Sequence, residues 1–271
     1  MLGRTLCRRL AFHDVRIFDL PEDDITDKKS VQTAFEKVRP HVVVHTAAMT
    51  AVDDCETSRD EAFRVNCDGS ACVAESAARV GARLIAISTD YVFDGTLTRS
   101  YCEEDRPAPA TVYGRSKLAG EEAIQQFCPD AAILRTAWLY GPGGPSFVHT
   151  MLRLGREDGP PVRVVNDQVG NPTSTDALAG LIEQFVERHE PGVFHATCEG
   201  EATWYDFAAM IFSLKGFTRP VVPCSSSEYP RPAPRPANSR LEKRALRVKG
   251  YRPMPHWQEA LEAFLERYPE G

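Results

Sequence analysis

The sequence predicts an α/β protein: a doubly wound parallel sheet with a smaller C-terminal lobe. Short runs of β-branched residues alternate with longer amphipathic segments in the first half of the chain, and this alternation is typical of parallel strands joined by crossover helices. Glycine or proline marks most of the junctions between the segments. The 271 residues, 42% of them hydrophobic, are enough to bury a large core.

The individual elements follow from the same pattern. We predict strands at Val15–Asp19, His41–Ala47, Arg83–Thr89, Ala131–Trp138, Val162–Asn166 and Val193–Thr197. We predict helices between them, at about 29–38, 58–80, 112–127, 176–189, 204–212 and 256–268. The opening "MLGRTLCRRL" contains a glycine that leads into a further helical run.

The alternation is most regular up to about Gly144, and this divides the chain. We expect residues 1–145 to form the sheet domain and residues 146–271 to form mainly the smaller lobe, with residues 176–198 returning to the sheet domain. The segment "VPCSSSEYPRPAPRPANS" is rich in proline and serine and cannot form regular helix or sheet. It is either a surface loop or a loop that closes over a ligand.

The charge of the chain argues against a polyanionic partner. Lys and Arg total 32 and Asp and Glu total 38, for a formal net charge of −6, so nucleic acid and anionic membranes are not expected partners. No run approaches the ~20 apolar residues of a membrane span, and the N-terminus lacks the apolar core of a secretory signal, so we expect a cytoplasmic protein. The 8 cysteines lack the paired spacing of a zinc site, so we expect reduced thiols and no metal.

Ligands bind doubly wound sheets at the carboxyl ends of the strands, so the residues there are the first candidates for a site. The predicted strand "VRIFD" ends in Asp19, and Gly3 lies where the last glycine of a dinucleotide fingerprint would fall. An acidic residue at that strand end binds the adenosine ribose hydroxyls and disfavours a 2′-phosphate, which favours NADH over NADPH. The next strand ends in Ala47 and Ala48, small residues that allow a flat cofactor to approach the backbone.

A second group of candidates could carry the chemistry. "ISTDYVFDG" places Thr89 and Asp90 at the end of the next predicted strand, where a hydroxyl can reach a substrate carbonyl. Tyr113 and Lys117 in "VYGRSKLAGEEA" are four residues apart, so they project from one face of a helix. A nearby ammonium lowers the pKa of a tyrosine from its usual value of about 10, which suits this pair to proton donation. Glu121 is expected on the exposed side of the same helix.

Eight segments resemble, in order, the extended short-chain dehydrogenase/reductase family, and within it the dTDP-4-dehydrorhamnose reductases. They are "TAAMTAVDDCE", "AFRVNCDGS", "STDYVFDG", "VYGRSKLAGE", "LRTAWLYG", "VNDQVGNPTS", "TWYDFA" and "RPANSRL". The resemblance covers nearly the whole chain from Met1. It implies a Rossmann fold, in which residues 1–145 bind NAD(P) and the smaller lobe binds a sugar nucleotide.

The resemblance also implies a reaction and a role for each site residue. The reaction is the reduction of dTDP-4-dehydro-β-L-rhamnose to dTDP-L-rhamnose, with hydride from NADH or NADPH. Tyr113 would protonate the keto oxygen, Lys117 would hold the nicotinamide ribose, and Thr89 would bond to the same oxygen. Substrate contacts are implied for Thr89, Asp90, Trp138, Arg235 and Asn238. Cofactor contacts are implied for Met1, Leu2, Gly3, Asp19, Asp24, Ile25, Ala47, Ala48 and Met49, together with Tyr113 and Lys117. A requirement for Mg²⁺ and the formation of a homodimer are left open.

The first strand of such a sheet and the start of its glycine loop have no counterpart in this sequence. We expect Met1 to be an internal methionine of a G-x-x-G-M-L-G motif, with about a dozen residues before it in the natural protein. Without that strand, the predicted strands at 15–19 and 41–47 would flank a gap with unpaired backbone groups. The pyrophosphate side of the cofactor cleft would then be open, and NAD(H) would bind weakly.

Two other functions remain open at the level of sequence. An epimerase or dehydratase acting on sugar nucleotides would share Tyr113 and Lys117, but it would recycle its cofactor instead of consuming it. A non-catalytic subunit, like the regulatory β subunit of methionine adenosyltransferase, would bind ligands without turnover. Net oxidation of NADH by a dTDP-4-keto sugar separates the reductase from both alternatives.

Overall fold

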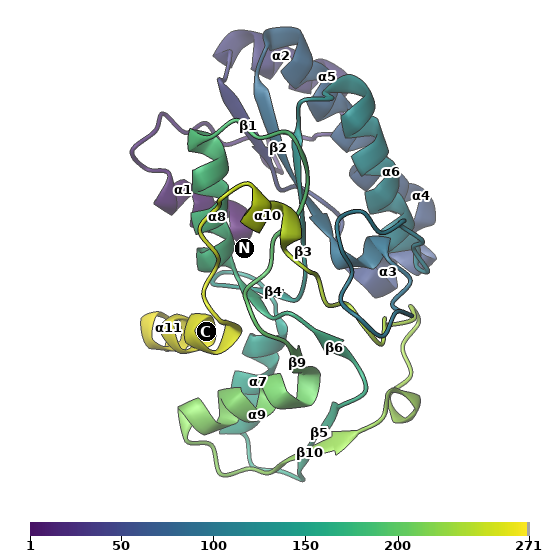
Figure 1. The fold of residues 1–271 in the computed structure, drawn as a ribbon, viewed down its shortest axis with the longest axis vertical. Helices are drawn as coiled ribbons and strands as arrows, with labels where there is room; N and C mark the ends of the chain where they lie inside the picture. The colour runs from purple at the N-terminus through teal and green to yellow at the C-terminus, as the bar shows by residue number, and fades with distance from the viewer. Residues whose placement is uncertain (270–271) are drawn as a thin grey trace.

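The computed structural model describes residues 1–269, and a four-stranded parallel sheet forms its centre (Figure 1). The strands are β1 (Val42–His45), β2 (Arg83–Thr89), β3 (Ala132–Thr136) and β8 (Gly192–His195), in the spatial order β1-β2-β3-β8. Neighbouring strands pair in parallel throughout. Strand β2 has the predicted bounds, β1 and β3 lie inside theirs, and β8 begins one residue early.

Helices cover both faces of this sheet, because alternate strand residues point in opposite directions. Leu84 and Ala86 of β2 pack with residues of α2 (Lys28–Val38) and α5 (Ser70–Val80), and α6 (Val112–Phe127) packs alongside them. Ile85 packs on the other side with residues of α1 (Leu2–Arg9) and α8 (Thr175–Glu187). The sheet is therefore doubly wound, as the sequence predicts.

A smaller lobe lies below the sheet domain in Figure 1. It contains α7 (Phe147–Arg156), α9 (Trp204–Lys215), and the parallel pair β5 (Val162–Val165) and β10 (Val221–Cys224). Short pairs join the two parts: β4 (Leu139–Tyr140) with β7 (Thr173–Ser174), and β6 (Val169–Gly170) with β9 (Ala202–Thr203). Helix α11 (Trp257–Arg267) packs against α8 and α9, and α10 (Arg244–Val248) packs on β8.

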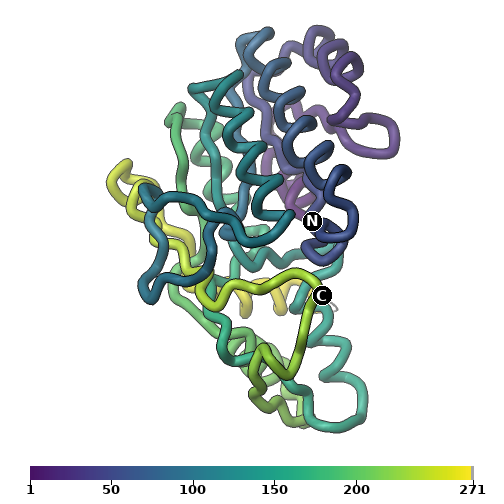
Figure 2. The backbone as a smooth tube through the Cα atoms, turned by 90° about the vertical axis from the view of Figure 1, so that its right-hand side faces the viewer, coloured from purple at the N-terminus to yellow at the C-terminus, as the bar shows by residue number. Residues whose placement is uncertain are grey.

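The proline- and serine-rich segment begins inside β10, so the expectation that it forms no sheet is wrong for Val222–Cys224, which pair with β5. The remainder contains one short 3₁₀ turn, η3 (Ser226–Glu228), and otherwise no regular helix or strand. In Figure 2 this yellow-green stretch runs from the smaller lobe across to the sheet domain. We call residues 225–239 the strap.

The strand predicted at Val15–Asp19 is wrong. Residues 14–19 form no ladder, and β1 pairs only with β2 among the residues that the structure describes. A single extended segment cannot satisfy its backbone N–H and C=O groups without a neighbouring strand. The expected gap between two strands is therefore not formed. Instead, β1 is the outermost strand of the sheet within residues 1–269.

The helix predicted over residues 58–80 is interrupted. The chain forms α3 (Val52–Thr57), α4 (Arg59–Phe63), a turn of π-helix η1 (Arg64–Gly69) and then α5. At η1 the helix passes very close to α6: a Cβ added to Gly120 would lie 2.2 Å from the Asn66 carbonyl oxygen. Amphipathic spacing does not reveal such an interruption, since the apolar residues keep their helical period across it.

Candidate active site

A cleft of about 2290 Å³ runs along the carboxyl ends of the strands and continues beside the free edge of β1. The sheet domain contributes Thr89, Tyr113 and Lys117 to its lining, and Trp138 and Trp204 line it from the side of the smaller lobe. The residues predicted to carry chemistry therefore share one cavity with groups from the other lobe.

The start of α6 fixes the position of Tyr113. The Thr111 hydroxyl caps the helix by accepting a hydrogen bond from the Gly114 amide at 3.0 Å. Gly114 lies against the chain after β2, since a Cβ there would lie 2.1 Å from the carbonyl oxygen of Tyr91. The rings of Tyr91 and Tyr113 pack edge to face with their centroids 5.4 Å apart. This contact brings Tyr113 beside the end of β2.

The Tyr113 phenol is buried and lies beside the Thr89 hydroxyl. Burial raises the pKa of Tyr113 well above its usual value, and the contact with Thr89 opposes this only in part. The expected net lowering of this pKa is wrong, because desolvation is the largest effect on the phenol. Tyr113 is therefore held as a protonated phenol, the form that can donate a proton.

Lys117 lies one turn further along α6 and is also buried. Its ammonium donates a hydrogen bond of 2.8 Å to the Ile87 carbonyl oxygen. Burial lowers the pKa of Lys117 to about 8, and the charge of Glu121 opposes that shift. The side chain is thus anchored to the backbone of β2 at the base of the cleft.

Asp90 follows Thr89 and is buried at the start of the 3₁₀ turn η2 (Asp90–Val92). The Thr89 hydroxyl donates a hydrogen bond of 2.9 Å to its carboxylate. Burial raises the pKa of Asp90 to about 7, while the hydrogen bond from Thr89 opposes that rise. A buried carboxyl group with a raised pKa therefore lies directly beside the Thr89 hydroxyl.

Glu121 is buried, contrary to the expectation that it lies on the exposed side of its helix. Its carboxylate accepts hydrogen bonds from the Arg135 guanidinium at 2.9 and 2.6 Å and another from the Ser88 hydroxyl. Arg135 in turn stacks on the Phe93 ring, 5.2 Å from its centroid. Only the fold brings Arg135 of β3 next to α6, so this buried ion pair below Lys117 could not be found from sequence spacing.

Asn66 of the π-helical turn holds the loop after β1 by hydrogen bonds to its backbone. Its amide oxygen accepts from the Met49 amide at 2.8 Å, and its amide nitrogen donates to the Met49 carbonyl and to Ser116. Met49 packs against Tyr113 and does not line the cleft. The structure therefore places Met49, an expected cofactor contact, behind the wall of the site.

Trp138 is held in the cleft from three sides. Its indole stacks on Trp204 with a centroid distance of 3.5 Å and an interplanar angle of 4°, and its Nε1–H donates to the Ser239 hydroxyl at 3.0 Å. A Cβ on Gly170 would lie 2.5 Å from the indole. The backbone of Trp138 has φ +47°, a left-handed conformation that non-glycine residues adopt at a cost. The surrounding contacts maintain this strained conformation.

The cofactor-side residues form the other wall of the cleft. The lining includes Met1, Leu2, Gly3, Asp19, Asp24, Ile25, Ala47 and Ala48. Asp19 is exposed, and its carboxylate accepts a hydrogen bond from the next amide, that of Leu20. Asp24 accepts hydrogen bonds from the amide and hydroxyl of Thr26, which lower its pKa. Both carboxylates lie at the cleft, and that of Asp24 also lies 3.8 Å from the guanidinium of Arg64 on η1.

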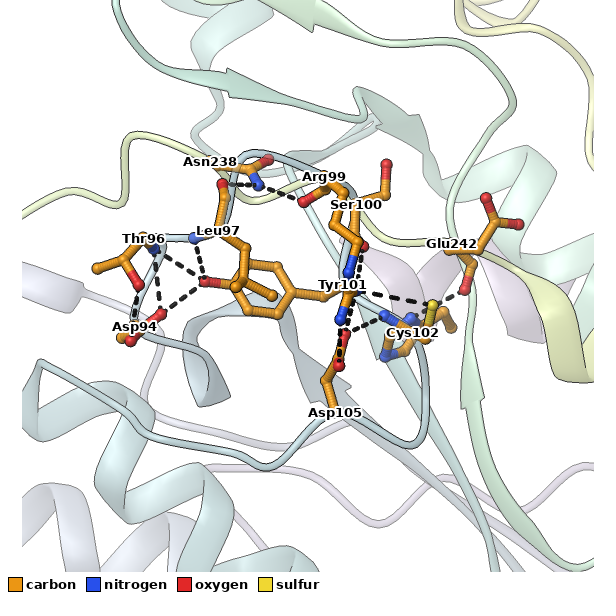
Figure 3. A network of polar contacts seen from close by, with 11 residues as sticks. Asp94, Thr96, Leu97, Arg99, Ser100, Tyr101, Cys102, Asp105, Asn238 and Glu242 are labelled. Carbon is orange, nitrogen blue, oxygen red and sulfur yellow. Dashed lines mark hydrogen bonds and ion pairs between the residues drawn. The ribbon is translucent and has the colours of Figure 1, made fainter.

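The two strap residues expected to contact substrate have different surroundings. Arg235 lines the cleft. Asn238 does not, because its side chain is used inside the protein (Figure 3). Its amide nitrogen donates to the carbonyl oxygens of Leu97 and Arg99, at 2.7 Å each, and its amide oxygen accepts from Arg240. The expected substrate contact of Asn238 is thus replaced by a structural role.

Residues 1–269 contain neither a metal-binding cluster nor a membrane-spanning helix. That part of the chain contains no group of three or more His, Cys, Asp or Glu side chains arranged to hold a metal ion. None of the described helices is both long enough and apolar enough to cross a membrane.

Comparison with known proteins identifies the family of this chain. The family described as RmlD substrate binding domain matches residues 1–269. The chain is 41% identical to the spore coat polysaccharide biosynthesis protein SpsK of Bacillus subtilis, over 98% of this chain and 93% of that protein. It is 40% identical to a dTDP-4-keto-6-deoxy-D-glucose reductase of Streptomyces niveus, over 96% and 92%.

A solved structure shows the same fold. It is the dTDP-4-dehydrorhamnose reductase of Bacillus anthracis in complex with NADP, which is 39% identical and superimposes with a TM-score of 0.95. The match covers 98% of this chain and 95% of that one. The chain therefore belongs to the RmlD family of the extended short-chain dehydrogenase/reductases.

Proposed function

We propose that this protein is an NAD(P)H-dependent 4-ketoreductase of dTDP-sugars, and that it reduces dTDP-4-dehydro-β-L-rhamnose to dTDP-L-rhamnose. The observation that carries the proposal is the buried pair of Thr89 and Tyr113, with Lys117 beneath it, in a cleft shared by both lobes. The names of the relatives support the class of substrate, since they include reductases of two dTDP-4-keto sugars.

The residues of the cofactor wall fit a dinucleotide. Helix α1 begins at the cleft, and no side chain of the described protein caps its first N–H groups, so these remain available to a pyrophosphate. Ala47 and Ala48 carry only methyl groups where a ring must approach the backbone. Lys117 lies further along the same cleft, where it would hold a nicotinamide ribose.

The reaction adds a hydride to the carbonyl carbon of the ketone and a proton to its oxygen. Bound NAD(P)H supplies the hydride. Tyr113 donates its phenolic proton to the keto oxygen, because its raised pKa keeps it protonated at neutral pH. Thr89 holds that oxygen by a second hydrogen bond and so orients the carbonyl.

Lys117 assists in the charged form. The phenolate that remains on Tyr113 after proton transfer is stabilised by a cation on the same helix face. With a pKa of about 8, Lys117 is still mostly protonated at pH 7. Trp138, held by its stack on Trp204, presents an indole against the sugar side of the cleft.

The proposal is tested by following NADPH absorbance after dTDP-4-dehydro-β-L-rhamnose is added to the purified protein. We expect sustained oxidation, with one NADPH consumed for each sugar nucleotide reduced. Conversion of the sugar without net oxidation would instead indicate an epimerase or dehydratase. Absence of any turnover, with ligand binding intact, would indicate a non-catalytic binding subunit.

A further inference from the structure

The strap is fastened to the sheet domain near its C-terminal end. Asn238 bonds to the carbonyls of the loop after β2, and this loop is itself held by Tyr101 and Asp94 (Figure 3). Gly95 has φ +77°, and a Cβ there would lie 2.4 Å from Pro236. The strap therefore passes in direct contact with this loop, with no room for a side chain between them.

A second attachment lies three residues before Asn238. Arg235 donates to both carboxylate oxygens of Asp53, at 2.9 and 2.8 Å, and the amide of Ala233 donates to the same carboxylate at 3.1 Å. Asp53 belongs to α3, in the sheet domain, so the pair joins segments 182 residues apart. The side chains of Arg235 and Asp53 are 23% and 28% exposed, so the pair lies at the mouth of the cleft and is not part of the core.

The ion pair with Asp53 uses only one hydrogen-bonding edge of the Arg235 guanidinium. A guanidinium has two edges that each present two parallel N–H groups, and each edge matches a carboxylate or a phosphate. Asp53 occupies the edge formed by Nη1 and Nη2, and Nη1 also donates to the Ala233 carbonyl. The structure gives Nε no partner within residues 1–269, so the Nε and Nη2 edge remains free.

The surroundings of the free edge suit an anion. Arg235 lines the cleft, as does Arg231, whose guanidinium lies 4.7 Å from the ring centroid of Tyr229. The charge of Arg235 also reaches Tyr91, whose ring packs on Tyr113. The cation is thus near the catalytic residues, yet it belongs to a strap that has no regular structure to orient it.

We propose that Asp53 is a positioning residue, which holds Arg235 so that the free edge of its guanidinium binds the diphosphate of a nucleoside diphosphate sugar. The class of ligand rests on the proposed function; the role of Asp53 rests on the contacts above. Asp53 fixes the long, flexible side chain before the ligand arrives, which reduces the conformational entropy lost on binding. It also secures the strap through the Ala233 amide.

The test measures binding of dTDP by calorimetry, without cofactor or turnover, so that it does not depend on the reaction. We expect Asp53→Asn and Arg235→Ala each to weaken dTDP binding about tenfold, the size of one charge-assisted contact. The double variant should be no weaker than Arg235→Ala alone, because Asp53 acts only through Arg235. Binding of thymidine, which has no phosphate, should be unchanged. Asp54→Asn, an exposed neighbour on the same helix, is the matched control and should bind dTDP normally.

A charge swap distinguishes two roles of Asp53: orienting the Arg235 guanidinium, and attaching the strap to α3. In Asp53→Arg/Arg235→Asp the ion pair can re-form and protect the strap from limited proteolysis, but the cation now belongs to α3. We expect protection to return and dTDP affinity to stay low. Recovery of dTDP affinity in the swap, or unchanged dTDP affinity in Asp53→Asn, would overturn the proposal. If dTDP binding follows these predictions but the unsubstituted protein reduces no dTDP-4-keto sugar, the proposed function fails and this inference stands.

Discussion

The two walls of the cleft differ in how firmly the protein holds them. One wall, which we call the catalytic wall, contains Tyr113 and Lys117. Both are buried and anchored to the end of β2, next to the buried ion pair of Glu121 and Arg135. On the cofactor wall the chain from 12 to 20 has no helix or strand, and Phe12, Ile17 and Leu20 are exposed, with Ile17 at 70%. The catalytic wall is thus buried and hydrogen-bonded, whereas this part of the cofactor wall is largely open to solvent.

The largest effect on activity should come from removing the proposed proton donor, Tyr113, on the catalytic wall. Tyr113→Phe keeps the ring and its packing on Tyr91 but has no proton to donate, so kcat should fall about 10²- to 10⁴-fold, the usual contribution of a general acid. KM should change little. Tyr205→Phe, on α9 and outside the cleft lining, should keep normal kcat. A Tyr113→Phe protein with full activity would show that another group donates the proton.

The buried ion pair should dominate the stability of the same wall. Arg135→Met leaves the Glu121 carboxylate buried without its partner, and the free energy of unfolding should fall by about 3–5 kcal/mol. The matched change on the other wall, Arg16→Met, breaks an exposed pair with Asp14 and should cost less than about 0.5 kcal/mol. Denaturant unfolding measures both. Equal losses would mean that the two walls do not differ in this way.

Asp90 should make stability depend on pH. Its pKa rises from 3.8 in the unfolded chain to about 7 in the folded protein, so the folded state retains the proton that the unfolded state releases. The stabilisation is complete below pH 4 and is lost as the pH rises through about 7, a change of a few kcal/mol. Asp90→Asn should remove this part of the profile. Parallel profiles for the two proteins between pH 4 and 8 would contradict the assignment.

A smaller effect should follow from ordering the cofactor wall. A variant with a short β-branched strand and a glycine-rich turn added before Met1 should pair with the free edge of β1 and bind NADPH about tenfold more tightly. A Gly/Ser extension of the same length is the control, since it cannot form a strand readily. Equal NADPH affinity for the two extended proteins would show that the edge of β1 does not limit cofactor binding.

The same contrast explains what could be predicted from sequence. Strand β2 and the pair of Tyr113 and Lys117 follow from local periodicity and spacing, because one strand end and one helix turn determine where they lie. The strand predicted at 15–19 is wrong because a strand needs a paired neighbour, and no described residue pairs with this segment.

The features that could not be predicted from sequence depend on contacts between residues far apart in the chain. Arg235 is paired with Asp53 across 182 residues, and Trp138 stacks on Trp204 of α9. Helical spacing placed Glu121 on a polar face, although Arg135 on β3 allows it to be buried. Each of these depends on how distant elements pack, which a pattern within one element does not contain.

In the proposed reaction a hydride reaches C4 of the sugar while Tyr113 protonates the oxygen. This reaction can be followed with NADPH that carries deuterium at the transferable position of the nicotinamide, by NMR of the dTDP-sugar product. We expect one deuterium at C4 in every product molecule, and product formation that is strongly slowed in Tyr113→Phe. A product without deuterium at C4, formed while the labelled cofactor remains reduced, would show that the proposed reaction is wrong.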